Sequence, residues 1–172
     1  VNKGVNLVIV GPEQPLIEGL SDELRESKIP VFAPSKVAAK LEGSKIFMKN
    51  LLKKYSIPTA RFLTSGDKDE LFGFIDSNHF SKIVIKADGL CAGKGVLIVD
   101  SKPEAKQIVE SMLSGERFGE AGRRIVIEEF LEGFELSVFA VCDGKDFVIL
   151  PTAQDHKRLL DDDLGPNTGG MG

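Results

Sequence analysis

The order of the apolar runs along this chain constrains its fold more than any other feature of the sequence. Residues 5–10 are apolar and mostly β-branched, which is typical of a buried strand in a parallel sheet. Leu16, Leu20 and Leu24 then share one face of a helix, and residues 29–33 form another short apolar run. Because a strand, a helix and a strand in this order form a βαβ unit, the beginning of the chain is predicted to be α/β.

Residues 35–55 keep the spacing of apolar side chains that is typical of helices. Gly43-Ser44 interrupts this pattern, and because serine is a preferred N-cap residue, a second helix is predicted to begin there. Ile57-Pro58 ends the second helix, since proline lacks an amide donor and disfavours a helical conformation in the residue before it.

The middle of the chain follows a different order of elements. Asp67 is predicted to cap a helix whose apolar face includes Leu71 and Ile75, and a further helix covers residues 105–112. Strands are predicted over residues 62–64, 82–86, 96–99 and 124–130. This part of the chain is therefore predicted to be a small α+β unit.

The last part of the chain is predicted to be antiparallel. Apolar runs over residues 134–142 and 147–150 flank Asp143-Gly144-Lys145, which is a good β-hairpin signal. Residues 154–158, which carry mixed charges, and residues 165–172, which are rich in glycine, are predicted to be loops.

These patterns predict three domains. Residues 1–60 form the end of a βαβ domain with a linking helix, residues 61–131 form a small α+β domain, and residues 132–172 begin an antiparallel domain. The chain has no initiator methionine, and a loop-forming cluster follows the last predicted element, so we expect the chain to be a piece of a longer protein.

The composition excludes several classes of function. The formal net charge is -4 and the sequence pI is about 5.3, so the chain has no basic footprint for nucleic acid or for an anionic membrane surface. No apolar run is long enough for a membrane span, and there is no signal peptide pattern. Cys91 and Cys142 form neither a zinc pattern nor a disulfide framework, which fits a reducing compartment. We expect a soluble, cytoplasmic protein.

A glycine-rich turn over residues 87–95 carries the first chemical signal. Glycines let backbone amides approach an anion, and lysines such as Lys86 add charge for phosphate. A P-loop would need glycine in place of Asp88 and Ser or Thr in place of Gly95, and the dinucleotide pattern fails at Ile98. Polyphosphate is the ligand that the turn favours, and a glycine hairpin without a ligand is the alternative.

Two further stretches could belong to the same site. Glu128 ends a predicted strand before a linker, and Glu135 follows on the next strand; backbone groups of the linker could read adenine while a carboxylate binds ribose. His156, Lys157 and Arg158 could bind an anionic substrate. A solvated charged stretch is the alternative in both cases. The adjacent aspartates at 161–163 are not expected to converge on a metal ion.

Several strings of this sequence together resemble one family. They are residues 11–13, 41–45, 84–89 with 92–96, and 127–131, and Gln154-Asp155-His156-Lys157-Arg158 with Gly165-Pro166-Asn167-Thr168-Gly169-Gly170-Met171-Gly172. They resemble phosphoribosylamine-glycine ligases, which belong to the ATP-grasp superfamily, over essentially the whole chain. The lysine and glutamate spacing is generic to ATP-grasp proteins, whereas the last two strings are much more specific to this ligase.

The resemblance implies an ATP-grasp-like fold, α/β and α+β, in which residues 61–131 form a lid. It implies that ATP phosphorylates the glycine carboxylate and that the amine of 5-phosphoribosylamine displaces the phosphate, giving glycinamide ribonucleotide, ADP and phosphate in purine biosynthesis. The expected partners are the small-molecule substrates glycine, 5-phosphoribosylamine and ATP, without nucleic acid or membrane, and the sequence does not give the oligomeric state. Two readings remain open: another ATP-grasp carboxylate–amine ligase, and a nucleotide-binding module without turnover.

Residue roles carry over from the resemblance by motif. The positions that match ATP-binding residues are Lys45, Lys86, Gly93, Lys94, Gly95, Glu128, Glu129, Phe130, Leu131, Glu135 and Asn167. The positions that match the substrate side are Gly11, Pro12, Glu13, Asp155, His156, Lys157, Arg158, Gly169 and Gly170. No side chain is identified as a protein nucleophile or as a metal ligand. The family's Mg²⁺ ligands are expected C-terminal to this chain, so these residues alone are expected to be inactive.

Overall fold

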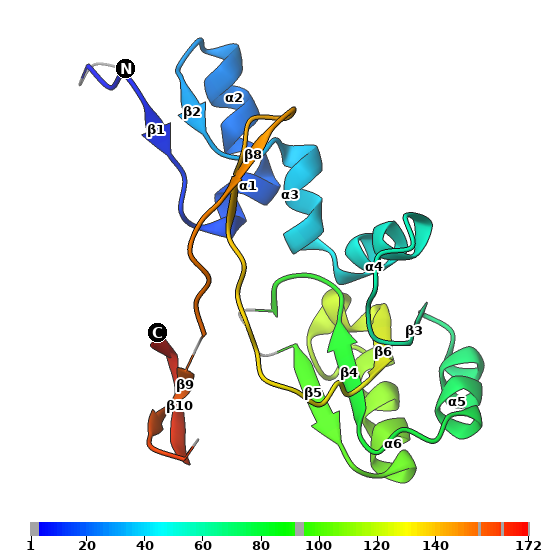
Figure 1. The fold of residues 1–172 in the computed structure, drawn as a ribbon. Helices are drawn as coiled ribbons and strands as arrows, with labels where there is room; N and C mark the ends of the chain where they lie inside the picture. Colours follow the sequence, from blue (N-terminus) through cyan, green and yellow to red (C-terminus); the bar gives the residue numbers. More distant parts are fainter. Residues whose placement is uncertain (1–3, 92–94, 155, 163, 172) are drawn as a thin grey trace. The chain divides into compact units, whose positions relative to one another are not determined.

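The computed structural model describes residues 4–91, 95–154, 156–162 and 164–171. Contacts divide the chain into two compact units, Val1–Phe130 and Leu131–Gly172. Figure 1 shows the elements of both units in chain order. Among the described residues, every helix is too short or too polar to cross a membrane.

The first unit begins with the predicted βαβ order. Strand β1 (Val8–Ile9) pairs in parallel with β2 (Val31–Phe32), and α1 (Glu13–Glu18) and α2 (Leu20–Glu26) lie between them in the chain. The prediction of one buried strand over residues 5–10 is wrong. Only two of these residues pair, and Ile9 is 69% exposed, because β1 has a single neighbouring strand among the described residues.

The leucine stripe does not form one continuous helix. Gly19 has a φ of 108°, in the left-handed region that glycine adopts readily, and it ends α1 and begins α2. Because the spacing of the apolar residues continues across Gly19, this spacing could not reveal that the helix breaks there. Downstream, α3 (Lys36–Gly43) and α4 (Lys45–Lys54) are separated at Ser44, whose hydroxyl accepts a hydrogen bond from the Phe47 amide, as the N-cap prediction required.

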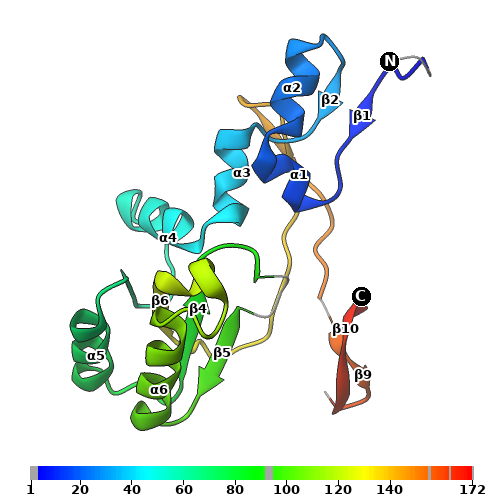
Figure 2. The same ribbon diagram turned by 180° about the vertical axis from the view of Figure 1, so that it is seen from behind.

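A four-stranded antiparallel sheet follows, with the strand order β3-β6-β4-β5. The strands are β3 (Phe62–Ser65), β4 (Ile83–Ala87), β5 (Val96–Val99) and β6 (Ile125–Glu129). Helices α5 (Lys68–Ser77) and α6 (Lys102–Leu113) lie beside the sheet in both views (Figures 1 and 2), and a short 3-10 helix, η2 (Gly119–Arg123), precedes β6. This arrangement confirms the predicted α+β unit.

Alternation along the strands gives this sheet two different faces. Residues such as Ile83 and Ile85 of β4 and Ile127 of β6 pack with Leu71 of α5 and Val109 of α6 in the buried core. The intervening residues of β4 and β6, which include Lys86 and Glu128, therefore lie on the opposite face. The core thus fixes which residues of the sheet can form a site.

The second unit contains two hairpins. Strands β7 (Ala140–Cys142) and β8 (Phe147–Ile149) are antiparallel, as the Asp-Gly signal predicted, although both are shorter than expected. Strands β9 (His156–Leu160) and β10 (Leu164–Met171) form the other hairpin. The prediction of loops over residues 154–158 and 165–172 is wrong for most of these residues, because pairing between the two segments overrides the low strand propensity of glycine, proline and asparagine.

Candidate nucleotide-binding site

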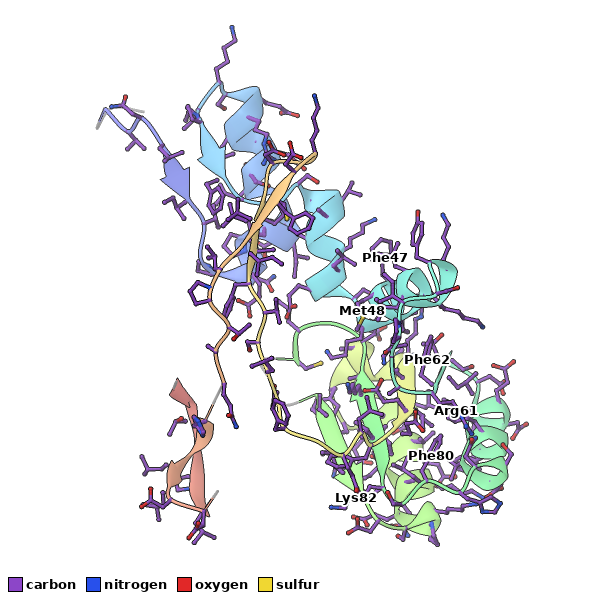
Figure 3. All side chains as sticks on the ribbon, viewed as in Figure 1. Phe47, Met48, Arg61, Phe62, Phe80 and Lys82 are labelled. Atoms are coloured by element: carbon purple, nitrogen blue, oxygen red, sulfur yellow. The ribbon has the colours of Figure 1, made fainter. Side chains whose placement is uncertain are left out.

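A cavity of about 210 Å³ in the first unit brings together α4, the end of α3 and the open face of the sheet. Its lining residues are Leu41, Glu42, Lys45, Met48, Lys49, Lys86, Leu90 and Val96. Lys45 and Lys86, which lie far apart in the sequence, therefore line one cavity. In Figure 3, Met48 of α4 and Phe62 of β3 lie in the region between α4 and the sheet.

Lys45 is held at the beginning of α4 by the glycine-rich turn. Its Nζ atom donates a hydrogen bond of 2.5 Å to the carbonyl oxygen of Gly89. The Asp88 carboxylate accepts from the Ser44 hydroxyl at 3.0 Å and from the Ile46 amide at 3.2 Å. Asp88 therefore caps α4 from another part of the chain and joins the turn to the helix. Sequence reasoning noted Asp88 only as a departure from the P-loop pattern and missed this role.

Lys86 reaches the cavity from the penultimate position of β4. Its ammonium forms an ion pair with Oε1 of Glu128, which lies diagonally across the adjacent strand β6. The Lys86 side chain is 25% exposed, whereas the Glu128 side chain is only 6% exposed. The Lys86 side chain thus contacts the buried Glu128 carboxylate and also lines the cavity.

Lys49 is the residue of this site that sequence reasoning missed. It is 5% exposed, its ammonium pairs with Oε2 of Glu128, and it donates a 2.7 Å hydrogen bond to the Thr59 hydroxyl. The same ammonium lies 5.2 Å from the centroid of the Phe62 ring. The signal that could have found it is its place at helical spacing between the apolar Ile46 and Leu52, where a charged residue is unexpected.

The lining of the cavity favours an anionic ligand. Lys45, Lys49 and Lys86 line it together with one carboxylate, Glu42. Lysine side chains that line a partly buried cavity raise its positive potential, and lysine is a point charge well suited to phosphate. Val96, which is 42% exposed, adds an apolar wall beside them.

The rest of the glycine-rich turn is only partly visible in the described residues. Gly93 and Lys94 lie outside them. At Gly95, a Cβ atom would stand 2.7 Å from Cβ of Cys91, so glycine is needed there for close packing. The Ala87 amide donates a 2.8 Å hydrogen bond to the Gly95 carbonyl, which closes the base of the turn.

The predicted hinge residues lie at the end of β6. The Glu129 side chain accepts a 2.8 Å hydrogen bond from the Arg61 amide, and the Phe130 ring lies 5.3 Å from the Lys82 ammonium. Arg61 itself lies over the Phe80 ring at 5.8 Å, and Figure 3 shows both side chains. Leu131 begins the second unit, to which Glu135 also belongs.

The predicted substrate residues fall into two groups. Gly11 and Glu13 line a second cavity of the first unit, of about 260 Å³, and Pro12 is the N-cap residue of α1. This cavity shares Leu41 and Glu42 with the lysine-lined one, so the two are neighbours.

The remaining predicted residues lie on the second hairpin of the second unit. His156, Lys157 and Arg158 are in β9, while Asn167, Gly169 and Gly170 are in β10. Asn167 is paired with Arg158 in the ladder. Asp155 lies outside the described residues. The described part of the chain holds no group of three His, Cys, Asp or Glu residues that could bind a metal ion.

Comparison with known families accounts for the whole chain. Residues 1–42 match the N domain of phosphoribosylglycinamide synthetase, and residues 43–172 match the ATP-grasp (A) domain of the same enzyme family. The boundary between the two matches falls within α3, immediately before α4 and Lys45.

Individual relatives agree with these matches. The chain is 50% identical over 170 residues to a phosphoribosylamine-glycine ligase of Ralstonia nicotianae and covers 40% of that protein. It is 54% identical over 168 residues to a chloroplastic phosphoribosylamine-glycine ligase of Arabidopsis thaliana, of which it covers 31%. The chain therefore spans well under half the length of these relatives.

Solved structures extend the likeness to the fold. A crystal structure of phosphoribosylamine-glycine ligase from Thermotoga maritima has a TM-score of 0.80 and 44% identity, over 97% of this chain and 40% of that one. A D-alanyl-alanine synthetase from Vibrio cholerae has a TM-score of 0.66 at 19% identity, over 87% of this chain and 45% of that one. The second likeness shows the shared fold alone.

Proposed function

We propose a function from one premise: this chain belongs to the phosphoribosylglycinamide synthetase family, and it carries the family's N domain sequence and the beginning of its ATP-grasp domain. The protein that contains it ligates glycine to 5-phosphoribosylamine with ATP and forms glycinamide ribonucleotide, ADP and phosphate, a step of purine biosynthesis. The observation that carries this proposal is the convergence of Lys45 and Lys86 on one cavity.

The chemistry of the reaction requires the charges that this cavity supplies. The glycine carboxylate attacks the γ-phosphorus of ATP, the bond between that phosphorus and the bridging oxygen breaks, and ADP leaves. The amine then attacks the acyl carbon and releases phosphate. Catalysis of such steps rests on positioning and on neutralising the phosphoryl oxygens. In this proposal Lys45 and Lys86, which line one cavity, pair with the phosphates of ATP.

An acyl phosphate must also be kept from water. In this proposal residues 61–131 act as the lid over the triphosphate, residues 1–60 end the N domain, and residues 132–172 begin the central domain. The tether from Asp88 to Ser44 holds the base of the glycine-rich turn against α4. Gly93 and Lys94, farther along the turn, would cover the phosphates. Glu135 would bind the ribose, and residues 155–158 and 167–170 would line the substrate side.

Magnesium is the cofactor that the family implies, and the residues described here do not fit it. They include no group of three suitable side chains. In this proposal the ligands of Mg²⁺ come from another part of the protein, and residues 1–172 by themselves do not turn over. The free thiols of Cys91 and Cys142 fit the proposed location in the cytoplasm.

The test is glycine-dependent release of ADP by the intact protein, with 5-phosphoribosylamine supplied in the assay. We expect Lys86→Ala to lower kcat/KM for ATP by about a hundredfold, because hydrogen bonds to charged groups contribute about 1.5–3 kcal/mol. Lys53→Ala is the matched control, since Lys53 is an exposed lysine on the neighbouring helix α4.

Three results would contradict the proposal. ADP release that does not depend on glycine would remove the proposed substrate. An unchanged kcat/KM in Lys86→Ala would remove the phosphate role of that lysine. Turnover by residues 1–172 alone, at a rate near that of the intact protein, would show that the chain needs no further metal ligands.

A further inference from the structure

One carboxylate in the first unit is shared by two lysines. Glu128 is 4% exposed; its Oε1 atom pairs with Lys86 and its Oε2 atom with Lys49. Among the described residues, Oε2 has no further hydrogen-bond partner, so the Lys49 ammonium alone compensates that side of the carboxylate. The shared carboxylate lies directly behind the lysine that we assign to phosphate.

Because Glu128 is paired with both Lys49 and Lys86, it cancels only part of the positive charge of the two lysines. A carboxylate paired with one ammonium cancels its charge, whereas the three groups Lys49, Glu128 and Lys86 together carry a net charge of about +1. Because Lys49 is buried and Lys86 is partly exposed to the cavity, the surplus charge is available at Lys86. Lys49 also has fixed partners, Thr59 and the Phe62 ring, that hold its ammonium beside Glu128.

We propose that Lys49 is a positioning residue: it neutralises Glu128, so that Lys86 keeps its positive charge for the phosphates of the nucleotide. This inference rests on the proposed function, since it assumes that the ligand at Lys86 carries phosphate. Without Lys49, the Glu128 carboxylate is balanced by Lys86 alone, so its negative charge cancels the positive charge that Lys86 offers to the cavity. Phosphate affinity then falls although Lys86 is still present.

The experiment measures the affinity of the intact protein for ATP and for adenosine by calorimetry or ligand displacement. In Lys49→Met we expect the ATP affinity to fall about tenfold, because Lys86 then offers less positive charge to the phosphates and a tenfold loss corresponds to about 1.4 kcal/mol. Adenosine affinity should change less than about twofold, because adenosine has no phosphate for Lys86 to bind. Lys49→Arg keeps the charge and should retain most of the ATP affinity.

A double variant tests the charge argument directly. In Lys49→Met with Glu128→Gln the carboxylate charge is gone as well, so Lys86 is released, and the ratio of ATP to adenosine affinity should recover most of the tenfold loss. The double variant also removes the unpaired buried carboxylate, so it tests the idea even if Lys49→Met alone does not fold. Lys53→Met, an exposed lysine of the same helix, is the matched control.

The outcomes separate this inference from the proposed function. Equal losses of ATP and adenosine affinity in Lys49→Met would mean that Lys49 only supports the fold, and they would overturn the inference. An unchanged ATP affinity, or a double variant whose affinity ratio does not recover, would overturn it too. A wild-type protein that does not bind ATP would overturn the proposed function itself.

Discussion

The four-stranded sheet of residues 61–130 and the hairpins of residues 131–172 are both antiparallel, but they bury their apolar residues very differently. Ile85, Ile125 and Ile127 of the sheet are fully buried. In the second unit, none of the residues whose exposure the structure describes is buried, and Phe134 is 80% exposed. Alternating strands therefore do not make a core by themselves.

The helices explain this difference. In the first region α5 and α6 cover one face of the sheet, and their apolar residues complete the core. Among the described residues of the second region there is no helix, and its hairpins pair only within themselves. Two-stranded hairpins without a covering layer are marginal in water, which is why the first region has a buried core and the described residues of the second do not.

The largest effect is expected from a core substitution in the sheet, whose loss of unfolding free energy can be compared with that of a matched substitution in the second region. Ile127→Ala should lower the free energy of unfolding by about 2–5 kcal/mol, since it removes buried methylene groups and leaves a cavity. Ile149→Ala, on the 59% exposed Ile149 of β8, is the matched change. It should cost less than about 1 kcal/mol in residues 1–172. Urea unfolding measures the free energy of unfolding of both variants. Equal losses of this free energy would show that the second region has a core of its own.

A smaller effect is expected from the tight packing near η2. Gly122→Ala would put a Cβ atom 2.5 Å from the Arg117 carbonyl oxygen and 2.8 Å from that of Met112, so it should destabilise the protein by about 1–3 kcal/mol. Gly73→Ala is the control, because nothing lies within 4 Å of a Cβ atom there and Gly73 is inside α5. Thermal unfolding should show a gain of about 0.5–1 kcal/mol for the control. A neutral Gly122→Ala would contradict the close packing.

The smallest effect concerns the turn between β7 and β8. Backbone amides of Asp146 and Lys145 donate to the Asp143 carboxylate and hold its pKa below the ordinary value of 3.8. A carboxyl with a lowered pKa contributes stability that is fully present above its unfolded value and is lost as the pH falls through the folded pKa. The contribution should therefore be complete above about pH 5 and fade below pH 4.

Amide chemical shifts of Lys145 and Asp146, followed from pH 6 to pH 2, measure this change. Asp143→Asn is the control, since it keeps an acceptor oxygen but does not titrate. Shifts of the same size in the control would assign the transition to another group.

Much of the fold was predictable because its signals are local. Ser44 and Asp67 cap helices where the sequence predicted, since each side chain accepts from an amide three residues further on. The strand over residues 96–99 has the predicted bounds. The lysine pair was found through the resemblance, and the cavity that Lys45 and Lys86 share agrees with the expectation that they converge.

The errors have a common cause. Gly19 breaks a helix whose apolar stripe continues across it, and β9 and β10 pair in spite of poor strand propensity. Asp88 caps a helix from 42 residues away, and no local pattern records such a contact. Each of these features depends on a partner that is distant in the sequence or on the backbone conformation of one residue.

The sequence by itself determined the α+β order of residues 62–130, the caps at Ser44 and Asp67 and the family, because periodicity, capping and motif spacing are local properties of a chain. Only the tertiary structure decided that Lys49 is buried and that Glu128 lies between two ammonium groups. The physical reason is that the partners of a buried charge are set by how α4 packs on β6, and that packing brings together residues that are far apart in the sequence.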